Sequence, residues 1–323
     1  MQPLFYECTS ENPCETLALE EALLERPAAD VFLLLYRHQP SVIIGRTQNA
    51  WAECRTERLK EDGVQLARRI SGGGAVYHDP GNLNFSFLMH PDAYDTERQL
   101  SVILQTVRSF GIEARFSGRN DLLADGRKFS GSAFCVRNQA CCHHGTLLIG
   151  TDMQKMADYL HAPQDKLAAK GVASVPARVI NLGDLCPGLT VDRMRGALLE
   201  EFAAEYGRPA GWEPDADRLA RARELAARNA AWGWRYGKTP PFDLTLRRRF
   251  RWGSLELNLS LERGCIKTAH AWSDAMDPDL ILALAPALQG CPLTGAAMSA
   301  ALKKLGPHPL LADIRQFLAS SSY

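Results

Sequence analysis

The sequence predicts an α/β protein of the mixed α+β type, with a large domain of mixed sheets and flanking helices and a small α/β second domain. Short apolar or alternating segments, typical of strands, are interspersed with helical patterns over the first two-thirds of the 323 residues. This length favours two domains at roughly 100–200 residues each. The run Gly-Lys-Thr-Pro-Pro at 237–241 suits neither a helix nor a strand. We therefore expect a large domain over residues 1–239 and a small one over 240–323.

Four helices are predicted in the large domain. Thr16–Glu25 consists mostly of good helix formers, and Ala50–Glu61 predicts a polar helix that ends at a glycine. Apolar residues recur at helical spacing through Leu100–Phe110, and another glycine closes that helix. Val191–Tyr206 predicts the fourth helix, with Thr190 as its N-cap.

Strands are predicted between these helices. In Asn82–Phe87, apolar residues alternate with polar ones, as in a half-buried strand. Leu66–Ile70 and Ala75–His78 predict two strands joined by the glycines 72–74. The other strands expected here are Val31–Tyr36, Ser41–Ile44, Arg115–Ser117, Lys128–Val136 and Gly145–Ile149.

The C-terminal segment predicts a self-contained unit of strands followed by helices. Glycines separate the expected strands, and two apolar helical patterns follow them. The expected elements are a hairpin of Arg248–Trp252 and Leu255–Leu261 through Gly253, a strand Ile266–Ala271, and helices Pro278–Leu288 and Thr294–Leu305.

Composition narrows the functional class. Lysine plus arginine and aspartate plus glutamate number 37 each, which counts against a nucleic-acid binder. The N-terminal residues lack the pattern of a signal peptide, and no apolar run reaches the ~18–20 residues of a membrane helix. The nine cysteines include no CxxC pair, so reduced thiols in the cytoplasm are expected.

The strongest motif is Arg68–Asp79, which contains three successive glycines after two arginines. Glycines let a backbone approach a ligand closely and point its amides at anionic oxygens, and a guanidinium binds phosphate through a charge-assisted fork. The spacing is that of neither a P-loop nor a Rossmann fingerprint. The motif also fits a glycine-rich hairpin with two solvent-exposed arginines.

A second motif places Lys128 among small residues, in Arg127–Ala133. A lysine there can hold a carboxylate and a phosphate together and stabilise the charge of a transfer step. Asp121, after Gly118, Arg119 and Asn120, can assist a magnesium ion. The alternative is a turn lysine that faces water.

The third motif is the pair His143 and His144, preceded by Cys141 and Cys142. Adjacent histidines on a strand point to opposite faces, so they do not bind one metal ion together. One histidine lining a pocket is the better interpretation. The cysteines are candidates for a nucleophile or for small buried apolar residues.

The order and spacing of these segments resemble those of lipoate–protein ligases. The resemblance covers nearly the whole chain, including the part that looks like the small accessory domain of two-domain ligases. The matching segments are Arg68–Asp79 with Gly81 and Asn82, Gly118–Asp121, Arg127–Ala133, His143–Leu148, Lys170–Val172, Ser174–Val175, Arg178–Val179, Asn181–Leu182, Phe250–Leu259 and Gly264–Asp274.

The resemblance implies a large domain related to the catalytic domain of biotin protein ligases and a two-step reaction. (R)-lipoate and ATP, with Mg²⁺, give lipoyl-AMP and pyrophosphate, and an acceptor lysine then attacks the mixed anhydride. The implied partners are apo lipoyl domains of 2-oxoacid dehydrogenase E2 subunits and the glycine-cleavage H protein. A monomeric cytoplasmic enzyme without nucleic-acid or membrane partners is expected.

The resemblance also implies roles for site residues. Lys128 would be catalytic and contact both phosphate and lipoyl carbonyl, Asp121 would hold Mg²⁺, and Tyr36 would lie at the dithiolane end of the pocket, where a packed strand aromatic is the alternative. The implied lipoate-binding residues are Tyr36, Lys128, His144 and Thr146. The implied ATP- and lipoyl-AMP-binding residues are Arg69, Ser71, Gly72, Gly73, Gly74, Ala75, Val76, Tyr77, His78, Asn120, Asp121 and Lys128.

Two other functions fit the same scaffold. An octanoyltransferase would use a thiolate, from Cys135, Cys141 or Cys142, and an acyl carrier protein without ATP. A non-catalytic lipoate-binding module would need neither Lys128 nor a phosphate-binding loop. The glycine loop and the small domain favour the ligase.

Overall fold

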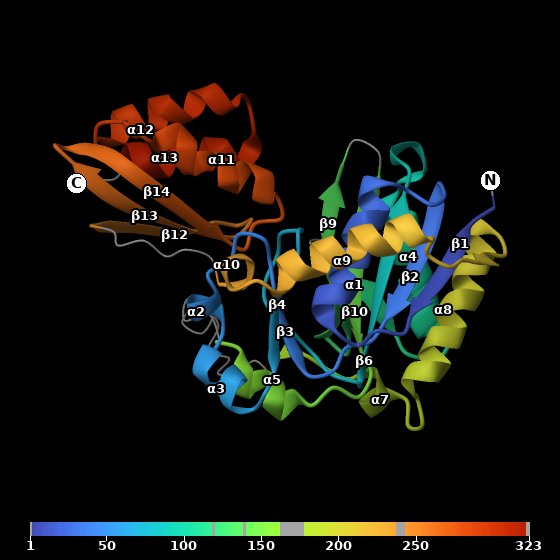
Figure 1. Cartoon of the computed structure of the whole chain (residues 1–323). Helices are drawn as coiled ribbons and strands as arrows, with labels where there is room; N and C mark the ends of the chain where they lie inside the picture. The colour runs from blue at the N-terminus through green and yellow to red at the C-terminus, as the bar shows by residue number, and fades with distance from the viewer. Residues whose placement is uncertain (1, 118–119, 138–139, 162–177, 237–242, 321–323) are drawn as a thin grey trace.

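The computed structural model describes residues 2–117, 120–137, 140–161, 178–236 and 243–320. Its centre is an eight-stranded mixed sheet (Figure 1). The strand order is β11 (Ala210–Gly211), β1 (Leu4–Cys8), β2 (Val31–Tyr36), β6 (Asn82–Met89), β10 (Cys141–Leu148), β9 (Arg127–Val136), β8 (Asp121–Ala124) and β7 (Ala114–Phe116).

Helices cover both faces of this sheet. On one face, α4 (Thr96–Arg108) and α8 (Val191–Tyr206) pack their apolar sides against β2 and β6. On the other, α1 (Pro13–Glu25) lies against the sheet and beside α9 (Ala216–Ala230), as Figure 1 shows. All eight residues of β6 are buried, so the prediction of a half-buried strand was wrong: its polar residues are enclosed within the fold instead of facing water.

A second, three-stranded sheet carries the glycine motif. It has the order β4 (Gln65–Arg68), β3 (Ser41–Ile44), β5 (Val76–His78), with β4 parallel and β5 antiparallel to β3. The two strands expected to be joined by the glycines therefore both pair with β3 and not with each other. The segment between them, residues 69–75 and here called the glycine loop, crosses the end of β3.

Several other element boundaries differ from the predictions. Helix α1 begins at Pro13 because the Asn12 side chain caps it. The helix expected over Ala50–Glu61 is two helices, since Cys54 is extended and bridges to Leu160. Thr190 caps α8 as predicted. The remaining elements in the described part of the large domain are α2 (Ala50–Glu53), α3 (Thr56–Glu61), η1 (Pro91–Ala93), α5 (Met153–Tyr159), α7 (Leu182–Leu185) and α10 (Trp232–Arg235).

The C-terminal elements form a three-stranded antiparallel sheet with helices on one face, drawn in orange and red in Figure 1. Helix α11 spans the predicted residues, whereas the pattern at 294–305 is a short helix continued by a 3₁₀ turn, and the last helix was not predicted. The elements are β12 (Leu244–Arg249), β13 (Ser254–Glu262), β14 (Cys265–Ser273), α11 (Pro278–Leu288), α12 (Gly295–Ala301), η3 (Leu302–Leu305) and α13 (Pro309–Ser320). The expected break at 237–241 lies outside the described residues, and the division at residue 240 stays a proposal.

The segment after β14 contacts the large domain directly. Ser273 and Thr47 exchange two hydrogen bonds, of 2.7 and 3.0 Å. The backbone N–H of Gly73 donates to the carbonyl oxygen of Ala275 at 3.1 Å, and Arg137 pairs with Asp279 at 2.9 Å. The C-terminal unit therefore rests against the glycine loop.

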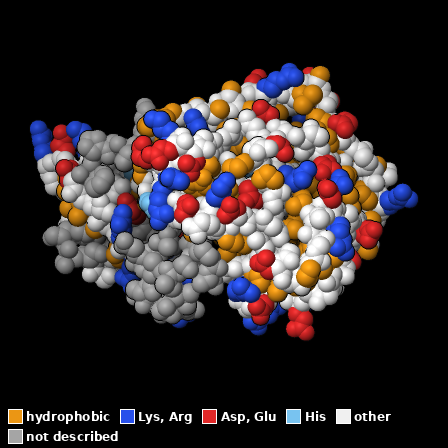
Figure 2. All heavy atoms as spheres, turned by 90° about the horizontal axis from the view of Figure 1, so that it is seen from below, with side chains coloured by type: hydrophobic (Ala, Val, Ile, Leu, Met, Phe, Trp, Pro, Cys, Tyr) orange, Lys and Arg blue, Asp and Glu red, His pale blue; other side chains and the backbone are white. Residues whose placement is uncertain are grey.

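Among the helices that the structure describes, we find none with both the length and the apolar character needed to cross a bilayer. Basic and acidic side chains are interspersed over the face drawn in Figure 2.

Two buried histidines make the fold sensitive to acid. His143 lies in the core, 4.7 Å from the ring of Phe134, and bonds Gln99 and Ser132. His38 is equally buried. Burial lowers the pKa of each imidazole from its ordinary value of 6.5 to about 3. Both histidines are therefore neutral in the folded protein.

We predict that the free energy of unfolding falls as pH is lowered from about 6.5 towards about 3, by up to ~1.4 kcal/mol per pH unit for each of these histidines. The unfolded chain takes up protons below its ordinary pKa, whereas the folded chain resists them until its lowered pKa. Urea unfolding across this range measures the slope. His143→Gln should reduce it, and His161→Gln, at an exposed position, should not. Equal slopes for wild type and His143→Gln would contradict the prediction.

Candidate functional site

A narrow cavity of about 90 Å³ lies where the glycine loop meets β2, β9 and β10. Most of the site residues implied by the resemblance line it. The lining comprises Leu17, Tyr36, Ile43, Arg69, Gly73, Gly74, Ala75, Val76, His78, Asn84, Asn120, Lys128, Gly131, Ser132, Ala133, His144, Gly145 and Thr146. A larger open hollow of about 710 Å³, lined by Arg108, Arg115 and Asp125 among others, contains none of the predicted residues.

Four predicted residues lie near the cavity without lining it. Tyr77 points to the other side of β5, since neighbours on a strand alternate, and its ring packs 5.6 Å from that of Tyr159. Ser71 and Gly72, in the glycine loop itself, are buried, and Asp121 lies beside Lys128. The matching segments Gly118–Arg119, Lys170–Val172 and Ser174–Val175 lie outside the described residues.

Arg69 holds the glycine loop from inside. Its Nη2 donates to the carbonyl oxygens of Gly72 at 2.7 Å and Gly74 at 2.8 Å, and its Nε donates to Ser71 Oγ at 3.1 Å. The side chain of Arg68 is also buried and donates to five backbone carbonyls. The alternative of a hairpin with two solvent-exposed arginines is therefore wrong.

The loop leaves no space for side chains at two glycines. A Cβ at Gly45, at the end of β3, would overlap the carbonyl oxygen of Gly73, and a Cβ at Gly72 would overlap that of Ala275. Gly73 has a φ of 90°, a left-handed conformation that favours glycine. The glycines thus serve the close crossing of three backbone segments.

Lys128 lines the cavity with its ammonium group partly exposed. Its Nζ pairs with Asp121 Oδ1 at 2.7 Å, and both side chains are about one-third exposed. A Cβ at Gly131 would lie 2.7 Å from this Nζ, so the small residues around Lys128 give the ammonium group its room. Thr146 Oγ1 accepts a hydrogen bond from the Gly131 amide at 3.3 Å, and Asn120 bonds the backbone of Ser132. These polar groups gather at the Lys128 part of the cavity.

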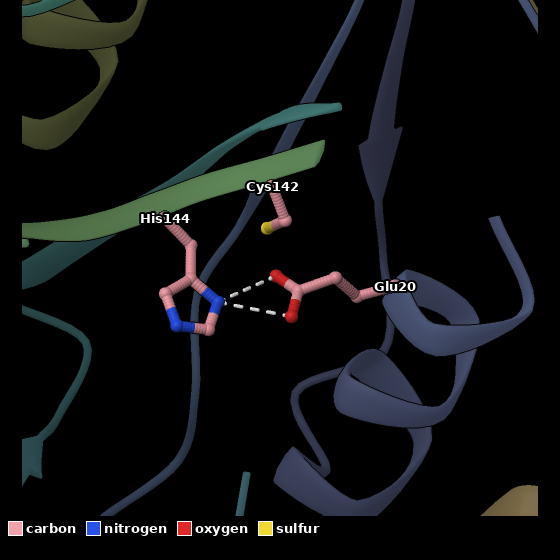
Figure 3. Close-up of side chains that lie close together, drawn as sticks. All are labelled: Glu20, Cys142 and His144. Atoms are coloured by element: carbon pink, nitrogen blue, oxygen red, sulfur yellow. Dashed lines mark hydrogen bonds and ion pairs between the residues drawn. The ribbon is translucent and has the colours of Figure 1, made fainter. Parts of the chain in front are cut away.

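His143 and His144 point to opposite faces of β10, as predicted. Whereas His143 enters the core, His144 lines the cavity and contacts Glu20 from α1 (Figure 3). Its Nδ1 lies 2.9 Å from both carboxylate oxygens of Glu20, and its Nε2 lies 2.7 Å from Ser71 Oγ.

Glu20 is the main site residue that the sequence analysis missed. Only 1% of it is exposed. It accepts hydrogen bonds from Ser86 Oγ at 2.5 Å and from His144. Burial, the largest influence, raises the pKa of Glu20, but His144, Ser86 and Arg69 together bring it below the ordinary value. A glutamate at helical spacing with Leu17 and Leu24, on the apolar side of a helix, is the signal that could have revealed it.

Glu20, Cys142 and His144 bring three potential metal-ligating atoms within 4.8 Å of one another. The carboxylate is already engaged by His144 and Ser86, and the charge of Arg69 nearby compensates it. The cluster is therefore satisfied as a hydrogen-bonded group.

His38 was also missed. Its Nδ1 lies 2.9 Å from the Nδ1 of His78, and its Nε2 lies 2.6 Å from Thr16 Oγ1. Burial, followed by the neighbouring His38, Arg69 and His144, lowers the pKa of His78 well below its ordinary value. Neutral His78, which lines the cavity, is thus oriented by His38.

The three candidate nucleophilic cysteines are buried, and none lines the cavity. Burial raises the pKa of Cys135 to about 11, and it also raises that of Cys141. Burial and the neighbouring Glu20 raise the pKa of Cys142 well above its ordinary value. These thiols are therefore protonated at neutral pH, whereas thiolate chemistry needs the opposite shift.

Known proteins are similar to this chain in sequence and in fold. Residues 12–203 match the family described as the lipoyl protein ligase A/B catalytic domain, and residues 239–314 match the bacterial lipoate protein ligase C-terminus. P. falciparum LipL1, solved in complex with lipoate, is 31% identical with a TM-score of 0.86, covering 99% of this chain and 100% of its own.

Two further structures cover about three-quarters of this chain. A bi-partite lipoate protein ligase from Thermoplasma acidophilum, described with its E2 lipoyl domain, is 30% identical with a TM-score of 0.65, covering 75% of this chain and 98% of its own. A lipoate-protein ligase A bound with ATP is also 30% identical, with a TM-score of 0.62, covering 73% and 98%. Through its catalytic-domain match and the 31% identity to LipL1 over almost its whole length, this chain belongs to the lipoyl protein ligase A/B family.

Proposed function

We propose that the protein is an ATP-dependent lipoate–protein ligase that forms lipoyl-AMP and transfers the lipoyl group to a lysine of an acceptor protein. The observation that carries this proposal is the cavity itself. Lys128 and polar groups gather in one part of it, Leu17, Tyr36 and Ile43 add apolar surface, and the glycine loop forms a wall. This arrangement suits an acyl chain that ends in a carboxylate beside a phosphate.

The chemistry requires activation because a carboxylate is inert towards an amine. A lipoate oxygen attacks the α-phosphorus of ATP and pyrophosphate leaves; the acceptor amine then attacks the acyl carbon and AMP leaves. Lys128 would stabilise the negative charge in both steps. Arg69 would act mainly by shaping the loop whose backbone meets the adenylate, since its donors already bond that loop. A lipoate-bound and an ATP-bound relative support these two substrates.

Asp121 would hold the Mg²⁺ that accompanies ATP. One carboxylate together with phosphate oxygens is a usual ligand set for this ion. Asp121 pairs with Lys128, so its carboxylate lies at the place where we expect the phosphates.

We propose apo lipoyl domains of 2-oxoacid dehydrogenase E2 subunits, together with the glycine-cleavage H protein, as acceptors, and a monomeric cytoplasmic enzyme. The relative described with its E2 lipoyl domain supports the first acceptor class. The interspersed charges of Figure 2 and the balance of 37 basic and 37 acidic residues favour a protein partner over a nucleic acid.

The function is tested by incubating the protein with lipoate, Mg-ATP and an apo lipoyl domain. Intact mass should show the gain of one lipoyl group, with release of AMP and pyrophosphate. Acyl transfer from an octanoyl carrier protein without ATP, abolished when Cys135, Cys141 and Cys142 are replaced by alanine, would establish the octanoyltransferase instead. Their protonated state and the fact that none of the three lines the cavity argue against that outcome.

Lys128→Ala should lower the rate of lipoylation by ~10²–10³-fold, because it removes a charge that stabilises the transition state. The fold should persist, since the side chain is partly exposed. Pyrophosphate release and lipoyl-domain mass measure the two steps. Lys155→Ala, an exposed lysine on α5, is the control. Near wild-type turnover by folded Lys128→Ala would rule out the assignment.

Gly72→Ala should slow lipoate activation by roughly ten- to a hundredfold, because overpacking of this kind costs ~1–3 kcal/mol. The new methyl group would displace the Ala275–Met276 backbone from the glycine loop. Transfer from presynthesised lipoyl-AMP should suffer less. Gly196→Ala, on α8 and outside the cavity lining, is the steric comparison, since nothing lies within 4 Å of that Cβ. Full activation by Gly72→Ala would show that this contact is dispensable.

A further inference from the structure

We propose that Glu20 is a positioning residue that sets the shape of the glycine loop through His144 and Ser71. This inference rests on the proposed function, since the process that it serves is lipoate activation. Glu20 itself is not among the residues lining the cavity, so it would act only through the residues that it holds.

Hydrogen bonds join four side chains in sequence, from Glu20 through His144 and Ser71 to Arg69. In each of these bonds the donor and the acceptor can be assigned. His144 Nδ1 faces two carboxylate oxygens, so it must carry the proton and donate to Glu20. In a neutral imidazole Nε2 is then an acceptor, and the Ser71 hydroxyl donates to it at 2.7 Å. The oxygen of Ser71 in turn accepts from Arg69 Nε at 3.1 Å. Each group has one role when His144 is in this tautomer.

The order serine, histidine, carboxylate is also that of a nucleophilic triad, and its distances fit one. Ser71, however, is fully buried and does not line the cavity. Its oxygen also accepts from a cationic guanidinium, which lowers its nucleophilicity. The three residues therefore work as a support for the loop and not as a nucleophile with its base.

The support ends at the loop backbone. Ser71 orients the side chain of Arg69, and Arg69 donates hydrogen bonds to the carbonyl oxygens of Gly72 and Gly74. These bonds fix the peptide units on both sides of Gly73. The buried carboxylate of Glu20 lies close enough to this buried guanidinium to interact with it electrostatically. Removing the charge of this carboxylate would allow His144 to adopt its other tautomer. It would also leave the positive charge of Arg69 with less nearby negative charge to balance it.

Glu20→Gln tests the proposal because it keeps the size of the side chain and removes the charge. An amide offers one acceptor and one donor to His144, so the imidazole should shift towards the tautomer with the proton on Nε2. Ring nitrogen NMR shifts, assigned with His144→Gln, measure the tautomer without substrate. Pyrophosphate release measures activation. We expect kcat to fall roughly 10- to 100-fold, as for loss of a hydrogen bond to a charged group, with little change in KM for lipoate.

Glu21→Gln is the matched control. It makes the same change on the next residue of α1, where the carboxylate pairs with Arg228 on α9. It should leave the tautomer and kcat at their wild-type values. Ser71→Ala is a second test should Glu20→Gln not fold, since it breaks the connection between His144 and Arg69 and should lower kcat in the same range.

The proposal is overturned if wild-type His144 carries its proton on Nε2 or on both nitrogens. It is also overturned if folded Glu20→Gln, or Ser71→Ala, releases pyrophosphate at the wild-type rate while wild type is active. If the wild-type protein forms no pyrophosphate at all, the proposed function is wrong. If the wild-type protein forms pyrophosphate and the variants form it equally fast, only the positioning role of Glu20 is wrong.

Discussion

The buried guanidinium of Arg69 is the group around which the site is built. A charge removed from water must be surrounded by acceptors, and here the acceptors are the carbonyl oxygens of the loop itself. A loop that turns its carbonyls inward to a cation leaves its other side for a ligand. The same demand accounts for Glu20 on α1, whose buried carboxylate balances this positive charge.

The close crossing of backbones sets a second constraint. The glycine loop passes over the end of β3 and under the segment after β14, so three stretches of chain from distant parts of the sequence meet with no Cβ between them. Gly45 and Gly72 must be glycines because a Cβ would overlap a neighbouring backbone. Gly73, in contrast, has a left-handed backbone conformation that favours glycine. The glycine triplet thus answers different requirements at neighbouring positions.

Local patterns predicted many elements correctly, and the misses have physical causes. The strands β2 and β3 and the helices α8 and α11 were predicted residue for residue, because each has a continuous apolar run or a clear cap. The alternation of apolar and polar residues in β6 predicted that one face of this strand is exposed to water. Its polar residues are instead buried, and Ser86 donates a hydrogen bond to the carboxylate of Glu20 on α1. Such partners are distant in sequence, so no local pattern reveals them.

The same limit applies to the site. The motifs placed Lys128, His144 and the glycine loop at one cavity, although which residues bind which substrate stays a prediction. Glu20 and His38 were missed because each looks like an ordinary member of a helix or a turn. Their role depends on His144 and His78, which only the fold brings near.

The hydrogen bond between Gly73 and Ala275 joins two backbones and involves no side chain. Any residue at position 275 offers the same carbonyl, so substitution there cannot remove the acceptor; only a change in the path of the chain can. The junction is therefore specified by the path of the two backbones, while the side chain of Ala275 packs in the core of the small domain. A separate polypeptide that presented the same backbone edge would satisfy the loop equally well, whatever its sequence at that point.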